Sequence, residues 1–265
     1  MLALKPVFLR MQINILGCSG GIGEGLQTTA LRVRHNTLID CGTGVGSLPI
    51  EELRQIEHVF LTHSHLDHIA GLPLLVDTIY AELQNRPLYI HCQEETYQAI
   101  AQHIFNWKIW PNFFELPNAE NPVIRFVPMR PGEVRPIEDL NIRMIEVLHT
   151  VPAVAYYLQD STASFAFSGD TGPSPLLWEA LNELDQLDLL LVECSFPDEL
   201  DDIALAAQHY SPSTLAKDLQ ILRHRPTLCV SHLQPGNEKR ILDQLDQRLD
   251  DLTIQQVSSG DILSL

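Results

Sequence analysis

The deciding stretch of this chain is Thr62-His63-Ser64-His65-Leu66-Asp67-His68, in which three histidines and one aspartate fall within six positions. It directly follows the apolar run Val59-Phe60-Leu61, which is typical of a buried strand. Because side chains alternate between the faces of a strand, we expect His63 and His65 to point the same way where the strand ends. Asp67 and His68 fall at the start of a helical pattern over residues 69–82. Imidazoles and carboxylates are common zinc ligands, so this turn predicts a metal site rather than a polar loop rich in histidine by chance.

Three further residues of metal-ligand type follow apolar, strand-like segments elsewhere in the chain. His149 follows residues 144–148, Asp170 follows residues 164–167, and His232 follows residues 228–231. A single histidine at a strand end is more often a structural residue than a ligand. Three such ends, in a chain that already holds the 62–68 stretch, predict that they complete the same metal site.

With these residues in order, the chain resembles the metallo-β-lactamase superfamily over nearly its whole length. The resemblance implies an α/β fold, a four-layer αββα sandwich, formed by one domain over residues 1–265. It also implies two divalent metal ions, zinc first, with manganese or iron as alternatives. His63, His65 and His149 would bind one ion, Asp67, His68 and His232 the other, and Asp170 would bridge them. Asp40 would be the carboxylate that holds the ligand loop in place; by residue type alone it is an ordinary turn residue.

Composition limits the function classes. The formal net charge of −17 repels nucleic-acid phosphates beyond a Debye length of about 8–10 Å, so we do not expect a nucleic-acid partner. A small anionic substrate is compatible, since two metal ions would create a local positive site. No apolar run reaches membrane-spanning length and the start lacks a signal-peptide pattern, so we expect a cytoplasmic protein whose five cysteines are reduced. Met11 is an alternative start, which would make residues 1–10 an N-terminal extension.

Hydrophobic patterns predict alternating strands and helices along the chain. We expect strands at 13–16, 28–34, 37–40, 58–61, 88–91, 153–158, 164–167, 188–192, 228–231 and 252–256. The segments 122–129 and 134–148 together are expected to form two or three more strands. We expect helices at 50–54, 69–82, 94–105, 175–184, 203–208, 213–222 and 236–249.

The glycine-rich loop 17–25 leads into a strand, which excludes a dinucleotide-binding turn. In the family this loop borders the metal cleft, where its amides could contact a phosphate. Residues 105–114 hold five aromatic side chains, which either pack under a loop, form a dimer face, or line the substrate pocket.

Glu193 and His209 are candidates for proton transfer. Phosphodiesterase branches of the family, including tRNase Z, carry a glutamate and a histidine at similar places, and a histidine paired with a carboxylate is a competent general acid. The competing interpretation makes Glu193 a strand-end charge and His209 a surface residue beside a helix. We predict the catalytic set Asp67, Glu193 and His209.

Within the family, the chain is most similar to the class II cyclic-nucleotide phosphodiesterases. The shared segments are residues 63–72, Glu193 to Pro197, and Ser231 to Pro235, whereas Gly71-Leu72-Pro73 and Ser168 to Thr171 are shared with tRNase Z. The resemblance implies hydrolysis of a 3′,5′-cyclic nucleotide, cAMP or cGMP, to the 5′-monophosphate through a metal-bridging hydroxide, by a homodimer. The alternatives are an RNA 3′-processing nuclease of tRNase Z type, a hydrolase of small esters or thioesters, and a non-catalytic binding protein.

Overall fold

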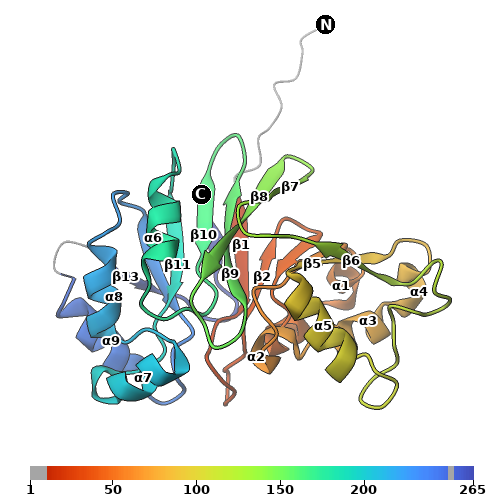
Figure 1. Cartoon of the computed structure of the whole chain (residues 1–265), viewed down its shortest axis with the longest axis horizontal. Helices are drawn as coiled ribbons and strands as arrows, with labels where there is room; N and C mark the ends of the chain where they lie inside the picture. The colour runs from red at the N-terminus through yellow and green to blue at the C-terminus, as the bar shows by residue number, and fades with distance from the viewer. Residues whose placement is uncertain (1–10, 250–253) are drawn as a thin grey trace, which may run out of the picture.

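The computed structural model of the chain describes residues 11–249 and 254–265. Two sheets stack face to face, and helices cover the outer face of each (Figure 1). The first sheet has the strand order β14-β1-β2-β3-β4-β5-β6 and the second has the order β13-β12-β11-β10-β9-β8-β7. The predicted four-layer αββα sandwich is confirmed. The predicted N-terminal extension, residues 1–10, lies outside the described residues, as do residues 252 and 253 of the predicted last strand.

The strands of the first sheet are β1 (Gln12–Gly17), β2 (Ala30–Val33), β3 (Thr37–Ile39), β4 (His58–Phe60), β5 (Leu88–Cys92), β6 (Ile124–Pro128) and β14 (Ile262–Ser264). Those of the second are β7 (Val134–Ile137), β8 (Leu140–Val147), β9 (Ala153–Gln159), β10 (Ser164–Phe167), β11 (Leu189–Glu193), β12 (Thr227–Ser231) and β13 (Ile254–Gln256). Beside the first sheet lie α1 (Ile50–Leu53), α2 (Leu66–Ile69), α3 (Leu72–Thr78), α4 (Tyr80–Leu83) and α5 (Glu94–His103). The second half contributes α6 (Pro175–Asn182), α7 (Asp201–Ala207), α8 (Pro212–Leu219) and α9 (Glu238–Asp246).

Three apolar layers hold the sandwich together. The central layer lies between the sheets and draws buried residues from both, including Ile13 and Phe60 from the first and Tyr156 and Phe165 from the second. A second layer packs helices against the outer face of the first sheet, and a third does the same for the second sheet, around Trp178. Each sheet is therefore buried on both faces where strands are parallel, which explains the continuous apolar runs of β11 and β12.

Strand direction brings the predicted ligands to one edge. β10, β11, β12 and β13 are parallel, and β8 runs in the same direction as β10 because each is antiparallel to β9. His149, Asp170, Glu193 and His232 follow or end β8, β10, β11 and β12, so all four lie at the carboxyl edge of the second sheet. Ligand sites of open α/β sheets form at this edge.

One sequence prediction of secondary structure is wrong, and one strand was not predicted. The helix predicted over 69–82 is three short helices, because Gly71 caps α3 and Pro73 can occupy only its first turn. A Cβ on Gly71 would lie 2.5 Å from the Gly42 carbonyl oxygen, so this break is packed against the β3 turn. The two or three strands predicted over 122–129 and 134–148 are three, β6 and the β7–β8 hairpin. β14, which pairs antiparallel with β1, was not predicted.

No helix among the described residues is long and apolar enough to cross a membrane. The five cysteines, at positions 18, 41, 92, 194 and 229, are all free thiols.

Candidate metal centre

The 62–68 stretch forms a loop and one helical turn, and hydrogen bonds to the buried carboxylate of Asp40 hold it in place. β4 ends at Phe60, so His63 and His65 lie in the loop beyond the strand. Both side chains still face the same group of ligand-type residues, as expected. Asp40 accepts hydrogen bonds from the Thr62 backbone N–H at 2.8 Å, the Thr62 hydroxyl at 2.8 Å and His68 Nδ1 at 2.7 Å. Asp40 is fully buried, and burial raises its pKa while His68 lowers it. These bonds aim His68 Nε2 away from Asp40, toward the other ligand-type residues.

The first group of ligand atoms belongs to His63, His65, His149 and Asp170. His65 Nδ1 lies 3.1 Å from His149 Nε2, and His63 Nε2 lies 3.7 Å from Asp170 Oδ2. His149 Nδ1 lies 3.0 Å from the Gln208 carbonyl oxygen, to which it donates its proton, leaving Nε2 as the nitrogen that faces the group.

The second group belongs to Asp67, His68, Asp170 and His232. His232 Nε2 lies 3.1 Å from Asp67 Oδ2 and 3.2 Å from Asp170 Oδ2. His68 Nε2 is also 3.2 Å from Asp170 Oδ2. Asp170 belongs to both groups, so the two groups fit a dinuclear site with Asp170 between the ions.

Buried polar atoms without partners support metal binding at this place. His63 Nε2, His68 Nε2 and Asp170 Oδ1 are buried and have no hydrogen-bond partner, and such atoms are costly unless an ion or water satisfies them. Burial lowers the pKa of His63, His65 and His149, which keeps these imidazoles neutral and able to coordinate. Burial would raise the pKa of Asp170, but His232 and His68 lower it well below its usual range. The set of imidazole and carboxylate donors suits zinc, manganese or iron.

Glu193 and His209 form a hydrogen-bonded pair beside the two groups. Glu193 ends β11, is fully buried, and accepts from His209 Nδ1 at 2.7 Å and from the Thr171 N–H at 3.0 Å. The His209 ring centroid lies 5.0 Å from that of His149 and 5.3 Å from that of His232. Burial lowers the pKa of His209, but Glu193 raises it to about 9. The competing interpretation of His209 as a surface residue is wrong, because its side chain is largely buried. Glu193 does lie at the end of a strand, as that interpretation has it, but it is fully buried and paired with His209.

The glycine-rich loop lies against this centre. A Cβ on Gly20 would lie 2.9 Å from the His232 carbonyl oxygen and 3.0 Å from His232 Nδ1, so only glycine fits there. Ile22, further along the loop, is 76% exposed. The loop therefore borders the cleft; contact of its amides with a phosphate stays a prediction.

Most of the aromatic stretch packs under its own loop. Phe105 and Phe113 are buried, and Phe113 and Phe114 contact the rings of Tyr80 and Tyr97 respectively. This packing accounts for Phe105, Phe113 and Phe114, and a role of the stretch in a substrate pocket or a dimer face stays a prediction. Trp107 is exposed.

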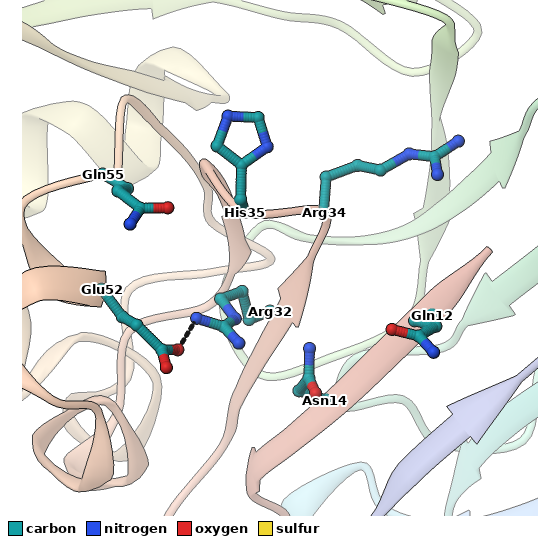
Figure 2. Close-up of a pocket in the computed structure, with 7 residues that line it drawn as sticks. All are labelled: Gln12, Asn14, Arg32, Arg34, His35, Glu52 and Gln55. Carbon is teal, nitrogen blue, oxygen red and sulfur yellow. Dashed lines mark hydrogen bonds and ion pairs between the residues drawn. The ribbon is translucent and has the colours of Figure 1, made fainter. Parts of the chain in front are cut away.

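A second hollow lies away from the metal centre (Figure 2), on the face of the β1–β2 pair opposite Ile13 and Val33. It is lined by Gln12, Asn14, Arg32, Arg34, His35, Glu52 and Gln55. Arg32 pairs with Glu52, and Arg34 extends away from that pair (Figure 2). Arg34 forms ion pairs with Asp139 and Asp160. Both guanidinium charges in this hollow are therefore paired with carboxylates.

Sequence reasoning missed three residues that support the ligands. Thr62 joins Asp40 to the ligand loop, the Gln208 carbonyl holds His149, and Ser195 contacts His232, Glu193 and His209. Only their nearness to predicted site residues in the sequence could have indicated them, because backbone carbonyls and hydroxyls have no spacing pattern of their own.

Comparison with known proteins follows this geometry. A family model described as a β-lactamase superfamily domain matches residues 35–234. The chain belongs to the metallo-β-lactamase superfamily. A probable 3′,5′-cyclic-nucleotide phosphodiesterase from Yersinia pestis is 26% identical over an alignment 229 residues long, which covers 73% of this chain and 63% of that protein. A 3′,5′-cyclic-nucleotide phosphodiesterase from Aliivibrio fischeri is 26% identical over 78% of this chain and 74% of its own length.

Ribonuclease Z relatives match a shorter part of this superfamily member. The enzyme from Clostridium beijerinckii is 30% identical over 155 residues, 55% of this chain and 48% of that protein. The chain thus spans from about half to three quarters of the curated relatives it matches. Among solved structures, unliganded yeast PDE1 superposes with a TM-score of 0.82 at 20% identity, covering 97% of this chain and all of that one. This last likeness establishes the fold, and the family membership with the two ligand groups indicates a metal-dependent hydrolase.

Proposed function

We propose that this protein is a phosphodiesterase that hydrolyses a 3′,5′-cyclic nucleotide to the nucleoside 5′-monophosphate. The observation that carries the proposal is the Glu193–His209 pair beside the two ligand groups. The leaving group of such a reaction is the 3′-oxygen of ribose, which needs a proton as the P–O3′ bond breaks. An ester of a good leaving group would need no such proton. The cyclic-nucleotide phosphodiesterase relatives support the same substrate class.

The residues divide the work as follows. Glu193 accepts a hydrogen bond from His209 Nδ1–H. Nε2 of the same ring is therefore the nitrogen that donates its proton to the departing 3′-oxygen. Asp67 is 29% exposed at its side chain. Burial would raise its pKa, but hydrogen bonds from His232 and His68 hold that pKa well below its usual range, so Asp67 stays a carboxylate that can accept a hydrogen bond from the attacking water and orient it. Two divalent ions held by His63, His65, Asp67, His68, His149, Asp170 and His232 would lower the pKa of bound water and neutralise charge on the phosphate oxygens.

The experiment compares two substrates with different leaving groups, using zinc- or manganese-loaded protein. His209→Ala is expected to slow hydrolysis of 3′,5′-cyclic AMP by about 10²–10⁴-fold, the usual contribution of a general acid. Hydrolysis of bis-p-nitrophenyl phosphate, whose leaving group needs no proton, should change far less. His65→Ala, which removes a ligand, is the blank for both. An equal loss on both substrates in His209→Ala would contradict the proposed role.

A second candidate is a nuclease of ribonuclease Z type, favoured by the relatives that carry that name. The net charge of −17 opposes binding of a large polyanion such as tRNA. Cleavage of precursor tRNA, with no turnover of cyclic nucleotides, would replace the first proposal with this one. A homodimer is proposed from the family resemblance alone, and its test is the mass of the protein in solution.

A further inference from the structure

Ser195 lies two residues beyond the end of β11 and is 3% exposed. Its hydroxyl oxygen is 2.9 Å from Glu193 Oε2, 3.0 Å from His232 Nδ1 and 3.1 Å from His209 Nδ1. One small side chain thus contacts a residue of the second ligand group and both members of the proposed acid pair. The register of β11 and β12, in which Glu193 is opposite Ser231, places Ser195 beside His232.

The protons of this network can be assigned in one consistent way. His232 Nε2 faces Asp67 and Asp170, so Nε2 must be unprotonated to bind a metal ion and Nδ1 must carry the proton. Among the described residues, Ser195 Oγ is the acceptor recorded for that proton. A hydroxyl has one proton to donate, and Glu193 Oε2 accepts it. His209 Nδ1 donates to the other oxygen, Glu193 Oε1, at the shorter distance of 2.7 Å.

The other histidines of the centre have partners of their own. His68 Nδ1 donates to Asp40, and His149 Nδ1 donates to the Gln208 carbonyl oxygen. His68, His149 and His232 are therefore oriented by three different acceptors, and the acceptor for His232 is a hydroxyl. His63 Nδ1 lies 3.0 Å from a different hydroxyl, that of Thr62. Loss of Ser195 leaves a buried N–H without a partner at His232 alone.

We infer that Ser195 is a positioning residue for the metal ion of the second group. Its hydroxyl holds His232 in the tautomer and orientation that direct Nε2 at Asp67 and Asp170, and it anchors this ligand on the same carboxylate that holds His209. The inference rests on the metal centre of the proposed function. It extends that function by assigning the affinity of one of the two ion sites to a side chain outside both ligand groups.

The test is a calorimetric titration of the metal-free protein with Zn²⁺ against a competing chelator. Ser195→Ala is expected to weaken one of the two sites by about 10–100-fold, the usual effect of removing a partner of a ligand, and to leave the other unchanged. Ser168→Ala is the matched control. Ser168 is buried like Ser195 and accepts from the Glu193 backbone N–H at 3.0 Å, while its hydroxyl donates to the Gly169 carbonyl oxygen at 2.7 Å. Among the described residues it bonds no ligand histidine. Ser195→Thr, which keeps the hydroxyl, should retain both sites.

The outcomes separate this inference from the proposed function. Wild-type affinity at both sites in Ser195→Ala would overturn the inference and leave the proposed function standing. An equal loss in Ser168→Ala would also overturn it, because the effect would then be general loosening. A wild-type protein that binds no Zn²⁺ would remove both. If Ser195→Ala does not fold, imidazole ¹⁵N spectra of the metal-free wild type decide, because no ion imposes the tautomer there. A proton on His232 Nδ1 supports the inference, and a proton on Nε2 alone overturns it.

Discussion

Two replacements of Asp40, by alanine and by asparagine, separate its contribution to folding from its contribution to metal binding. The carboxylate accepts from two donors that cannot turn away, the Thr62 backbone N–H and His68 Nδ1, in a fully buried place. Asp40→Ala leaves both without a partner, which costs about 1–3 kcal/mol each, or about 2–6 kcal/mol of the free energy of unfolding. Asp40 also has a φ of 56°, a left-handed conformation that asparagine tolerates better than alanine. A loss of this size approaches the whole stability of a typical domain.

Asp40→Asn should fold but lose affinity at the second ion site. Its carbonyl oxygen can still accept from Thr62, while its amide nitrogen would face His68 Nδ1, 2.7 Å away, as donor against donor. The imidazole proton then moves to Nε2, the atom that faces Asp170 at 3.2 Å, and a protonated nitrogen cannot bind a metal ion. We expect a loss of about 10–100-fold in affinity, or about 1.4–2.7 kcal/mol, at that site only.

Two measurements check this prediction. Urea unfolding of the metal-free proteins should rank stability as wild type, Asp40→Asn, then Asp40→Ala, with the larger gap at alanine. Zinc titration of Asp40→Asn should show one site with wild-type affinity and one weakened. The reasoning would be refuted by an asparagine variant that is as unstable as the alanine variant, or by one that binds both ions as tightly as the wild type.

Two other predictions concern backbone packing and pH. In Gly42→Ala the new Cβ would lie 2.2 Å from the Asp67 carbonyl oxygen, so urea unfolding should show that the free energy of unfolding falls by about 1–3 kcal/mol or more. Gly46→Ala is the control and should be near neutral, because its Cβ would meet nothing within 4 Å. Equal effects of the two substitutions would contradict the clash. Burial, together with the charge of His58, lowers the pKa of His91 to about 3, so between about pH 6.5 and 3 the unfolded chain binds this proton and the folded protein does not. The contribution of His91 to the free energy of unfolding is therefore fully present above about pH 6.5 and decreases as the pH falls below that value. At pH 5 the wild type should have lost about 2 kcal/mol more of its free energy of unfolding than His91→Gln has. Parallel pH profiles of unfolding in the two proteins would refute this prediction.

The local sequence by itself determined which residues have metal-ligand chemistry and where they lie on the strands. The 62–68 stretch, and the histidines and aspartate at the ends of apolar runs, are short-range patterns whose period and residue type are visible without a structure. The break at Gly71 and Pro73 was visible too, but a continuing apolar period suggested one helix, and packing against the β3 turn decided otherwise.

Only the tertiary structure decided which groups support those ligands. The bond from His232 to Ser195 depends on the pairing register of β11 with β12, and the bond from His149 to Gln208 depends on where the left-handed end of α7 falls. β14 was missed because its three residues are too short for a pattern and are stabilised by pairing with β1, at the other end of the chain. Register and long-range pairing arise from the packing of whole sheets, so no local window of sequence contains them.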